Sequence, residues 1–136
     1  MIIVLDTNVL ISGILNPYGK TAAILRLVAD GTIQVAYDLR ILSEYRDVLN
    51  RPKFNFAKED VESFVDQIEQ EGLLVSVKPS RFRLPDPDDE PFLEVALSAG
   101  VNAIVTGNKR HFRLKEYEGV KICSPAEFLE MVRETM

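Results

Sequence analysis

Two apolar runs joined by a polar turn make the first sixteen residues the most constraining stretch of the chain. The run at residues 2–5 is short, continuous and β-branched, which is typical of a strand buried on both faces of a parallel sheet. The run at residues 9–15 is interrupted by Ser12 and Gly13 and has the composition of a buried helix. Asp6 therefore lies where a central strand ends and a helix begins, and ligands of open α/β sheets bind at such positions.

The carboxylate of Asp6 admits two interpretations. Burying a charge between two apolar segments is costly unless a partner compensates it, which favours a functional group. Asp, Thr and Asn are also good helix N-caps, so a structural role as a cap explains Asp6 equally well. If Thr7 or Asn8 caps the helix instead, the Asp6 carboxylate is free to face a ligand.

Composition predicts one globular domain, residues 1–136. The chain is 46% hydrophobic and 27% charged, which are ordinary values for a soluble protein. Its single cysteine, Cys123, excludes an internal disulfide framework and a Cys-based zinc site. No stretch approaches the roughly 18 apolar residues of a membrane span, and the N-terminus lacks the basic start of a signal peptide. We therefore expect a cytoplasmic protein that makes no membrane contact.

Predicted strands and helices alternate along the rest of the chain. The segments expected to be strands are residues 33–37, 73–77, 103–105 and 120–122. The segments with helical periodicity are residues 21–29, 38–50, 54–71, 91–100 and a last helix that begins after Ser124. Strands joined by helical crossovers predict an α/β fold with a parallel sheet.

One acidic residue shares the apolar face of a predicted helix. Glu44 follows Ile41 by three residues and precedes Val48 by four, so the three side chains lie on the same side. A functional acid that faces inward explains this position. A place at the rim of the core, or a salt bridge to a nearby Arg, explains it as well.

Four acids, Asp86, Asp88, Asp89 and Glu90, crowd the start of another predicted helix. One acid is enough to cap a helix and complement its dipole. Two unit charges about 4 Å apart repel by about 4 kcal/mol at an effective dielectric constant of ~20, and a bound cation removes that penalty. Of the four, Asp89 projects from the core side, because it precedes Phe92 by three residues.

In a parallel sheet, the groups that follow each strand gather at one edge. Asp6 and Asn108 follow two of the predicted strands, and Glu44 and Asp89 belong to helices that can reach the same edge. An all-oxygen cluster without paired His or Cys residues suits Mg²⁺ or Mn²⁺ rather than zinc. Such a site activates water and stabilises charge on a phosphodiester.

The net charge of −5 argues against a protein that coats nucleic acid non-specifically. Basic residues nevertheless gather in short clusters that can hold phosphates locally. The candidates for RNA-phosphate contacts are Arg46, Arg51, Lys109, Arg110 and Arg113. Solvated surface charge is the ordinary explanation of any one such cluster taken alone.

Three spaced motifs stand out in the chain: VLDTNVLIS at the start, LSEYRDVLNRPKF in the second quarter and LPDPDDEPFLEVALSAGVNAIVTGN in the third. These motifs resemble those of the PIN domain family. Together they span nearly the whole chain, and the chain is similar to the VapC-like members described as toxins of toxin–antitoxin pairs. The resemblance implies a three-layer α/β/α sandwich with a central, mostly parallel five-stranded sheet. It also implies a Mg²⁺- or Mn²⁺-dependent ribonuclease that cleaves phosphodiester bonds of single-stranded RNA.

The same resemblance assigns the acids of the site. The catalytic residues correspond to Asp6, Glu44 and Asp89, with Asp88 as the rival to Asp89. The metal ligands are these acids together with Asn108, which stands where the family normally has a fourth acid. The Asn side chain can coordinate a metal but brings no charge.

Further residues and partners follow from the resemblance. Thr7, Asn8 and Thr106 support the site. His111 stands near the place where many relatives carry an Asp, and it is a candidate proton donor to the leaving oxygen. The family also implies an antitoxin protein as partner, and homodimers or higher homo-oligomers.

Two other functions remain open from the sequence. The absence of a fourth acid at Asn108 is expected in a catalytically weak PIN-like module that binds RNA or protein. Response-regulator domains also gather Asp residues at strand ends, but they need a Lys near the last strand end, and Lys121 lies within that strand. Retained RNA binding without cleavage selects the binding module, and labelling by a small phosphodonor selects the response regulator.

Overall fold

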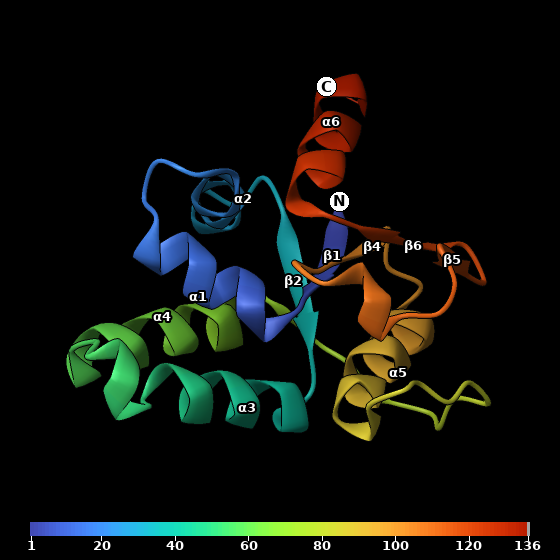
Figure 1. Cartoon of the computed structure of the whole chain (residues 1–136), viewed down its shortest axis with the longest axis horizontal. Coiled ribbons are helices and arrows are strands. Elements are labelled where there is room, and N and C mark those ends of the chain that lie inside the picture. Colours follow the sequence, from blue (N-terminus) through green and yellow to red (C-terminus); the bar gives the residue numbers. More distant parts are fainter. Residues whose placement is uncertain (136) are drawn as a thin grey trace.

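The computed structural model describes residues 1–135, which form one sheet of six strands with helices on both sides (Figure 1). The strands are β1 (Ile2–Leu5), β2 (Gln34–Tyr37), β3 (Leu73–Leu74), β4 (Ala103–Val105), β5 (Glu116–Tyr117) and β6 (Val120–Cys123). Their order is β3-β2-β1-β4-β6-β5, and every neighbouring pair is parallel except β5 and β6. The predicted α/β fold with a mostly parallel sheet is confirmed.

Six helices and three short 3₁₀ turns connect the strands. The helices are α1 (Thr7–Leu15), α2 (Lys20–Ala29), α3 (Leu39–Leu49), α4 (Lys58–Glu71), α5 (Glu90–Ala99) and α6 (Pro125–Thr135). The 3₁₀ turns are η1 (Pro52–Phe54), η2 (Pro87–Asp89) and η3 (Lys109–His111). In Figure 1, α1 to α4 lie on one side of β1 and β2, and α5 lies on the other, so the predicted α/β/α sandwich is confirmed. Helix α6 packs against β4, β6 and α2.

The order of the strands places a topological switch point at the centre of the sheet. From β1 the chain moves to one side through β2 and β3, and then returns along α5 to place β4 on the other side of β1. The strand order therefore reverses between β1 and β4. In doubly wound sheets, ligands bind outside the carboxyl ends of the strands at such a switch point.

Strand β1 fits the central position because its side chains are buried on both faces. Ile3, Val4 and Leu5 are fully buried, and they pair in register with β4 on one side while β2 pairs on the other. Tyr45 of α3 is also fully buried, and its hydroxyl donates a hydrogen bond of 2.5 Å to the Leu5 carbonyl oxygen. The core thus anchors the end of β1 directly before Asp6.

A sixth strand adds to the five that the sequence predicts. Strand β5 pairs antiparallel with β6 through a tight turn in which Glu118 and Gly119 have φ values of 48° and 91°. Two successive positive φ values are the mark of a two-residue hairpin turn. A strand of two residues is too short to show an alternating pattern, so the sequence analysis did not separate it from the preceding loop.

The start of α4 also differs from the prediction, which placed a helix from residue 54. The helix begins at Lys58, because Pro52 opens a 3₁₀ turn that ends at Asn55 in the left-handed region (φ 53°, ψ 36°).

None of the helices within residues 1–135 is long and apolar enough to cross a membrane.

Candidate metal centre

Asp6 lies at the carboxyl end of β1 and is 6% exposed. Its Oδ2 accepts hydrogen bonds from the Thr106 hydroxyl over 2.7 Å and from the Asn8 amide over 3.3 Å. Burial raises the pKa of Asp6, and the hydrogen bond from Thr106 is the largest opposing effect. Although Asp6 occupies the N-cap position of α1, its side chain makes no capping hydrogen bond. The carboxylate is therefore held by Thr106 and Asn8 and does not cap the helix.

The expectation that Thr7 or Asn8 caps α1 is wrong, because no side chain caps this helix. The Thr7 hydroxyl instead donates to Oε2 of Glu44 on α3. The Asn8 amide oxygen accepts the backbone N–H of Gly107 over 3.0 Å, which ties α1 to the loop after β4. Both residues thus connect separate elements around Asp6.

Asp89 ends η2 immediately before α5 and is 8% exposed. Its Oδ2 is buried and has no hydrogen-bond partner within the described residues, although Nδ1 of His111 lies 3.2 Å away. Burial raises the pKa of Asp89 to about 6; the charge of Asp6 adds to the rise, and His111 opposes it. A buried carboxylate oxygen without a hydrogen-bond donor is a costly feature that a bound cation would relieve.

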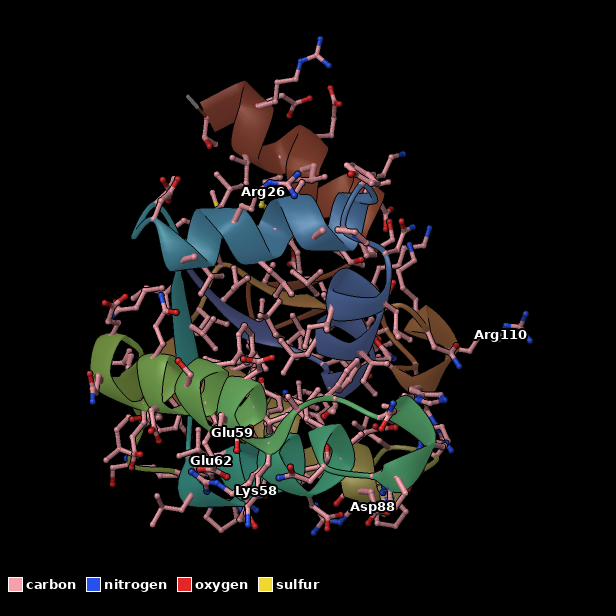
Figure 2. All side chains as sticks on the ribbon, turned by 90° about the vertical axis from the view of Figure 1, so that its left-hand side faces the viewer. Arg26, Lys58, Glu59, Glu62, Asp88 and Arg110 are labelled. Atoms are coloured by element: carbon pink, nitrogen blue, oxygen red, sulfur yellow. The ribbon has the colours of Figure 1, made fainter. Side chains whose placement is uncertain are left out.

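The neighbouring acids of the same run point elsewhere. Asp88 is exposed, and its backbone N–H is bound by the Asp86 carboxylate, which makes Asp86 the cap of η2. Figure 2 places Asp88 at the outer edge of the molecule. The carboxylate of Glu90 accepts the backbone N–H of Leu84 over 3.0 Å. Of the four crowded acids, Asp89 is therefore the one that turns toward Asp6.

Glu44 lies on the face of α3 that turns toward α1, and it is partly buried. Burial is the largest cause of its raised pKa, the hydrogen bond from Thr7 opposes the rise, and the charge of Asp6 adds to it. Glu44 is thus close enough to Asp6 for the Asp6 charge to raise its pKa. It borders the closest group of possible metal ligands without belonging to it.

That closest group consists of Asp6, Asp89 and His111, whose ligand atoms all lie within 4.8 Å of one another. His111 ends η3, which begins directly after Asn108 in the loop that follows β4. Asn108 itself is exposed; its Oδ1 accepts the Arg110 backbone N–H over 3.3 Å, and its Nδ2 lies 2.9 Å from Nε2 of His111. The fold therefore places His111 beside Asp6 and Asp89. Asn108 is exposed and contacts His111, but it is not part of the ligand group.

From the sequence, His111 is predicted only as a proton donor, and its place in the ligand group is visible only in the structure. A signal was present, since His111 follows Asn108 by three residues and a 3₁₀ turn has three residues per turn. That turn is visible only once the loop is folded, because nothing in GNKRHF requires a helical conformation.

Three of the five candidate phosphate-binding residues form ion pairs with acids of the protein. Arg46 pairs with Glu62 at 3.3 Å, Arg51 with Asp47 at 3.8 Å and Lys109 with Glu127 at 2.7 Å. Across residues 1–135, neither Arg110 nor Arg113 forms an ion pair, and in Figure 2 the Arg110 side chain extends away from the body of the protein.

Comparison with known proteins places this arrangement in a family. The model of the PIN domain matches residues 2–110. A comparison with curated proteins finds no significant match. A chain in the crystal structure of VapBC2 from Rickettsia felis, bound to a DNA fragment from their promoter, superposes with a TM-score of 0.61 at 18% sequence identity, over 91% of this chain and 98% of that one. Because the family model covers most of its length, the protein belongs to the PIN domain family.

Proposed function

We propose that this protein is a metal-dependent endoribonuclease that cleaves single-stranded RNA and acts as the toxin of a toxin–antitoxin pair. The observation that carries the proposal is the buried Oδ2 of Asp89, which accepts no hydrogen bond within residues 1–135, together with the separation of at most 4.8 Å between the ligand atoms of Asp89 and Asp6. Membership in the PIN domain family, whose members are generally metal-dependent nucleases, supports the same reaction class.

The residues present fit a divalent cation. Asp6 and Asp89 are both more than nine-tenths buried, and burial raises the pKa of each. Carboxylates are the ligands that Mg²⁺ and Mn²⁺ prefer, and the Glu44 carboxylate is close enough to Asp6 to be affected by its charge. His111 adds a nitrogen ligand, which Mn²⁺ accepts more readily than Mg²⁺ does.

The cation would supply charge stabilisation of the phosphodiester and a water molecule of lowered pKa. The protein's own groups position the ligands. Thr106 and Asn8 hold the Asp6 carboxylate from two directions, and Thr7 holds Glu44. Such supporting hydrogen bonds orient metal ligands and contribute strongly to affinity.

The His111 ring lies between Asn108 and Asp89. Nδ2 of Asn108 is 2.9 Å from Nε2 of His111, and Nδ1 of His111 is 3.2 Å from Oδ2 of Asp89. His111 is thus close enough to Asp89 to share a cation with it.

The structural neighbour suggests partners for this protein. The structural neighbour is a VapBC2 complex bound to DNA, and it shares the fold of this chain. We include an antitoxin protein as the partner, a homodimer or higher homo-oligomer as the assembled state and the cytoplasm as the location of the protein. Co-expression with the product of an adjacent gene, followed by co-purification, tests the first of these.

A catalytically weak binding module is the second candidate, and Asn108 is the observation that favours it. This exposed amide, engaged by Arg110 and His111, brings no charge to the position of the fourth acid. A protein that binds single-stranded RNA but leaves it intact in Mn²⁺ would be this module.

The deciding experiment is cleavage of a pool of single-stranded RNAs with Mg²⁺, with Mn²⁺ and with a chelator. We expect cleavage only with a metal, and its loss in Asp6→Asn and Asp89→Asn. Asp66→Asn, a change at an exposed acid of α4, is the matched control and should cleave like the wild type. Equal cleavage by Asp6→Asn and Asp66→Asn would refute the proposed centre.

A further inference from the structure

The segment between α3 and α4 carries two aromatic rings stacked face to face. The centroids of Phe54 and Phe56 are 5.6 Å apart and the ring planes differ by 10°. Asn55 between them adopts the left-handed conformation, which Asn tolerates better than most residues. Figure 1 shows this segment at the outer end of α3 and α4, away from the sheet. The turn thus displays an aromatic stack at the periphery of the molecule.

The two rings have different neighbours. Phe56 packs against the hydrophobic core, whereas Phe54 is not among the partly buried residues that do so. Phe54 lies on Phe56, and the ammonium group of Lys53 lies 5.1 Å from the Phe54 centroid. Core packing therefore explains the inner ring but does not account for the outer ring, which is half-buried and contacts Phe56 and Lys53.

The segment that carries the stack is basic, although the protein as a whole is acidic. Residues 51–58 include Arg51, Lys53 and Lys58 and no acid, and the acids Glu59 and Asp60 follow in the first turn of α4. Lys53 has no ion-pair partner in the part of the chain that the structure describes. The Arg51–Asp47 pair is exposed and long at 3.8 Å, and such pairs contribute little. The segment is complementary to a polyanion.

Helix α3 connects the candidate metal centre to the stack. Glu44 lies five residues, about 7.5 Å along the axis, before the end of α3 at Leu49, and Arg51 follows that end by two residues. The charge of Arg51 reaches Glu44, where it opposes the rise of the Glu44 pKa. A strand whose phosphate occupies the centre can therefore extend along α3 to the stack.

From these contacts we infer that Phe54 and Phe56, with Lys53 and Arg51, form a subsite that stacks an unpaired nucleobase of single-stranded RNA and holds an adjoining phosphate. Aromatic rings combined with basic side chains are the usual means of binding single strands without reading their sequence. A duplex, whose bases are already stacked, offers no free base to Phe54. This subsite rests on the proposed function, because it requires that the substrate is single-stranded RNA.

The test uses the full chain and a 12-nucleotide single-stranded RNA that carries 2-aminopurine, with Ca²⁺ in place of a catalytic metal. Fluorescence anisotropy gives the affinity, and quenching of 2-aminopurine reports stacking. Phe54→Ala should weaken binding roughly tenfold and abolish the quenching, within the range expected for loss of one base–aromatic stack. Phe54→Tyr should retain both signals, and Lys53→Glu should weaken binding without abolishing the quenching.

Tyr18→Ala is the matched control, because Tyr18 is 97% exposed on another segment and should not affect either signal. Circular dichroism verifies that each variant is folded. If the wild type binds no single strand, or if Phe54→Ala binds and quenches like the wild type, the inference is overturned. It is also overturned if Phe54→Ala changes only the oligomeric state, because the rings would then contact protein.

The outcomes separate this inference from the nuclease proposal. Stacking that depends on Phe54 in a protein that never cleaves RNA would support the subsite and refute the nuclease. If cleavage depends on Asp6 but RNA binding is the same with and without Phe54, the nuclease proposal is supported and the subsite is refuted.

Discussion

The Thr106 hydroxyl donates a hydrogen bond to Oδ2 of Asp6 over 2.7 Å, and its oxygen accepts the backbone N–H of Asn108 over 3.0 Å. Thr106 follows β4 and Asp6 follows β1, so one fully buried hydroxyl joins the two strand ends at the switch point. This contact orients a carboxylate that would otherwise rotate about its side-chain bonds.

Replacing Thr106 by Val removes this hydroxyl while keeping the shape of the side chain. We expect a loss of about 1–3 kcal/mol in the free energy of unfolding, because Asp6 and the Asn108 N–H each lose a buried partner. Metal affinity should fall by about 10–100-fold. Thermal unfolding and calorimetric titration with Mn²⁺ measure both effects, and Thr106→Ser, which keeps the hydroxyl, should restore most of the metal affinity.

Asp6→Asn should have opposite effects on activity and stability. Cleavage should disappear, whereas the metal-free protein should gain on the order of 1 kcal/mol, because the substitution removes a buried charge that repels Asp89. For a chain of this length, that gain raises Tm by about 3–5 °C. A lower Tm for the metal-free variant would instead mean that Asp6 has a purely structural role.

Divalent cations should stabilise the wild type and not the variants of the two buried acids. A ligand at one hundred times its Kd adds about 2.7 kcal/mol to the free energy of unfolding. Thermal scans with increasing Mn²⁺ should therefore show a rising Tm for the wild type and for Asp66→Asn. Equal shifts in Asp6→Asn and Asp89→Asn would place the bound cation elsewhere.

Asp89 should make the metal-free protein less stable as the pH rises. Its pKa in the folded protein is about 6, above the ordinary value of 3.8, so the folded state binds the proton more tightly than the unfolded state does. The resulting contribution, about 3 kcal/mol, is complete below pH 4 and is lost as the pH rises through 6.

Urea unfolding at a series of pH values tests this effect. The quantity to compare is the free energy of unfolding of the wild type and of Asp89→Asn at each pH. The variant should be the less stable protein at pH 4, or equal to the wild type, and the more stable one at pH 7.5. A difference that does not depend on pH would contradict the raised pKa of Asp89.

Arg110→Gln should weaken binding of single-stranded RNA and lower its dependence on salt. One phosphate contact to a single strand contributes about 0.7 to the slope of log K against log salt concentration. Arg26, which lies on α2 far from Arg110 in Figure 2 and donates to the Pro17 carbonyl, provides the control as Arg26→Gln. Equal slopes for the two variants would remove Arg110 from the set of RNA contacts.

Much of the fold can be predicted from short-range patterns. The continuous apolar run of β1 predicts a strand buried on both faces, and the structure has it at the centre of the sheet. Asp6 and Asp89 are equally visible, the first from its place after that strand and the second from its spacing to Phe92. These predictions succeed because side-chain direction repeats with a fixed period along a strand or a helix.

Other features escape such patterns because they depend on how loops fold. Asn55 and Glu118 adopt left-handed backbone conformations that no local rule demands of them; Asn55 ends the 3₁₀ turn η1, and Glu118 helps to reverse the chain between β5 and β6. His111 reaches Asp89 only because a 3₁₀ turn follows Asn108.

By itself, the sequence determined the parallel α/β architecture, the family motifs and the acids at the ends of elements. Only the tertiary structure decided which of those acids meet. It separated Asp89 from Asp88, withdrew Asn108 to the surface and brought His111 to the buried pair. The physical reason is that burial and charge repulsion act between residues far apart in the chain, so a carboxylate acquires a raised pKa and an unpartnered oxygen only after the sheet and helices have closed around it.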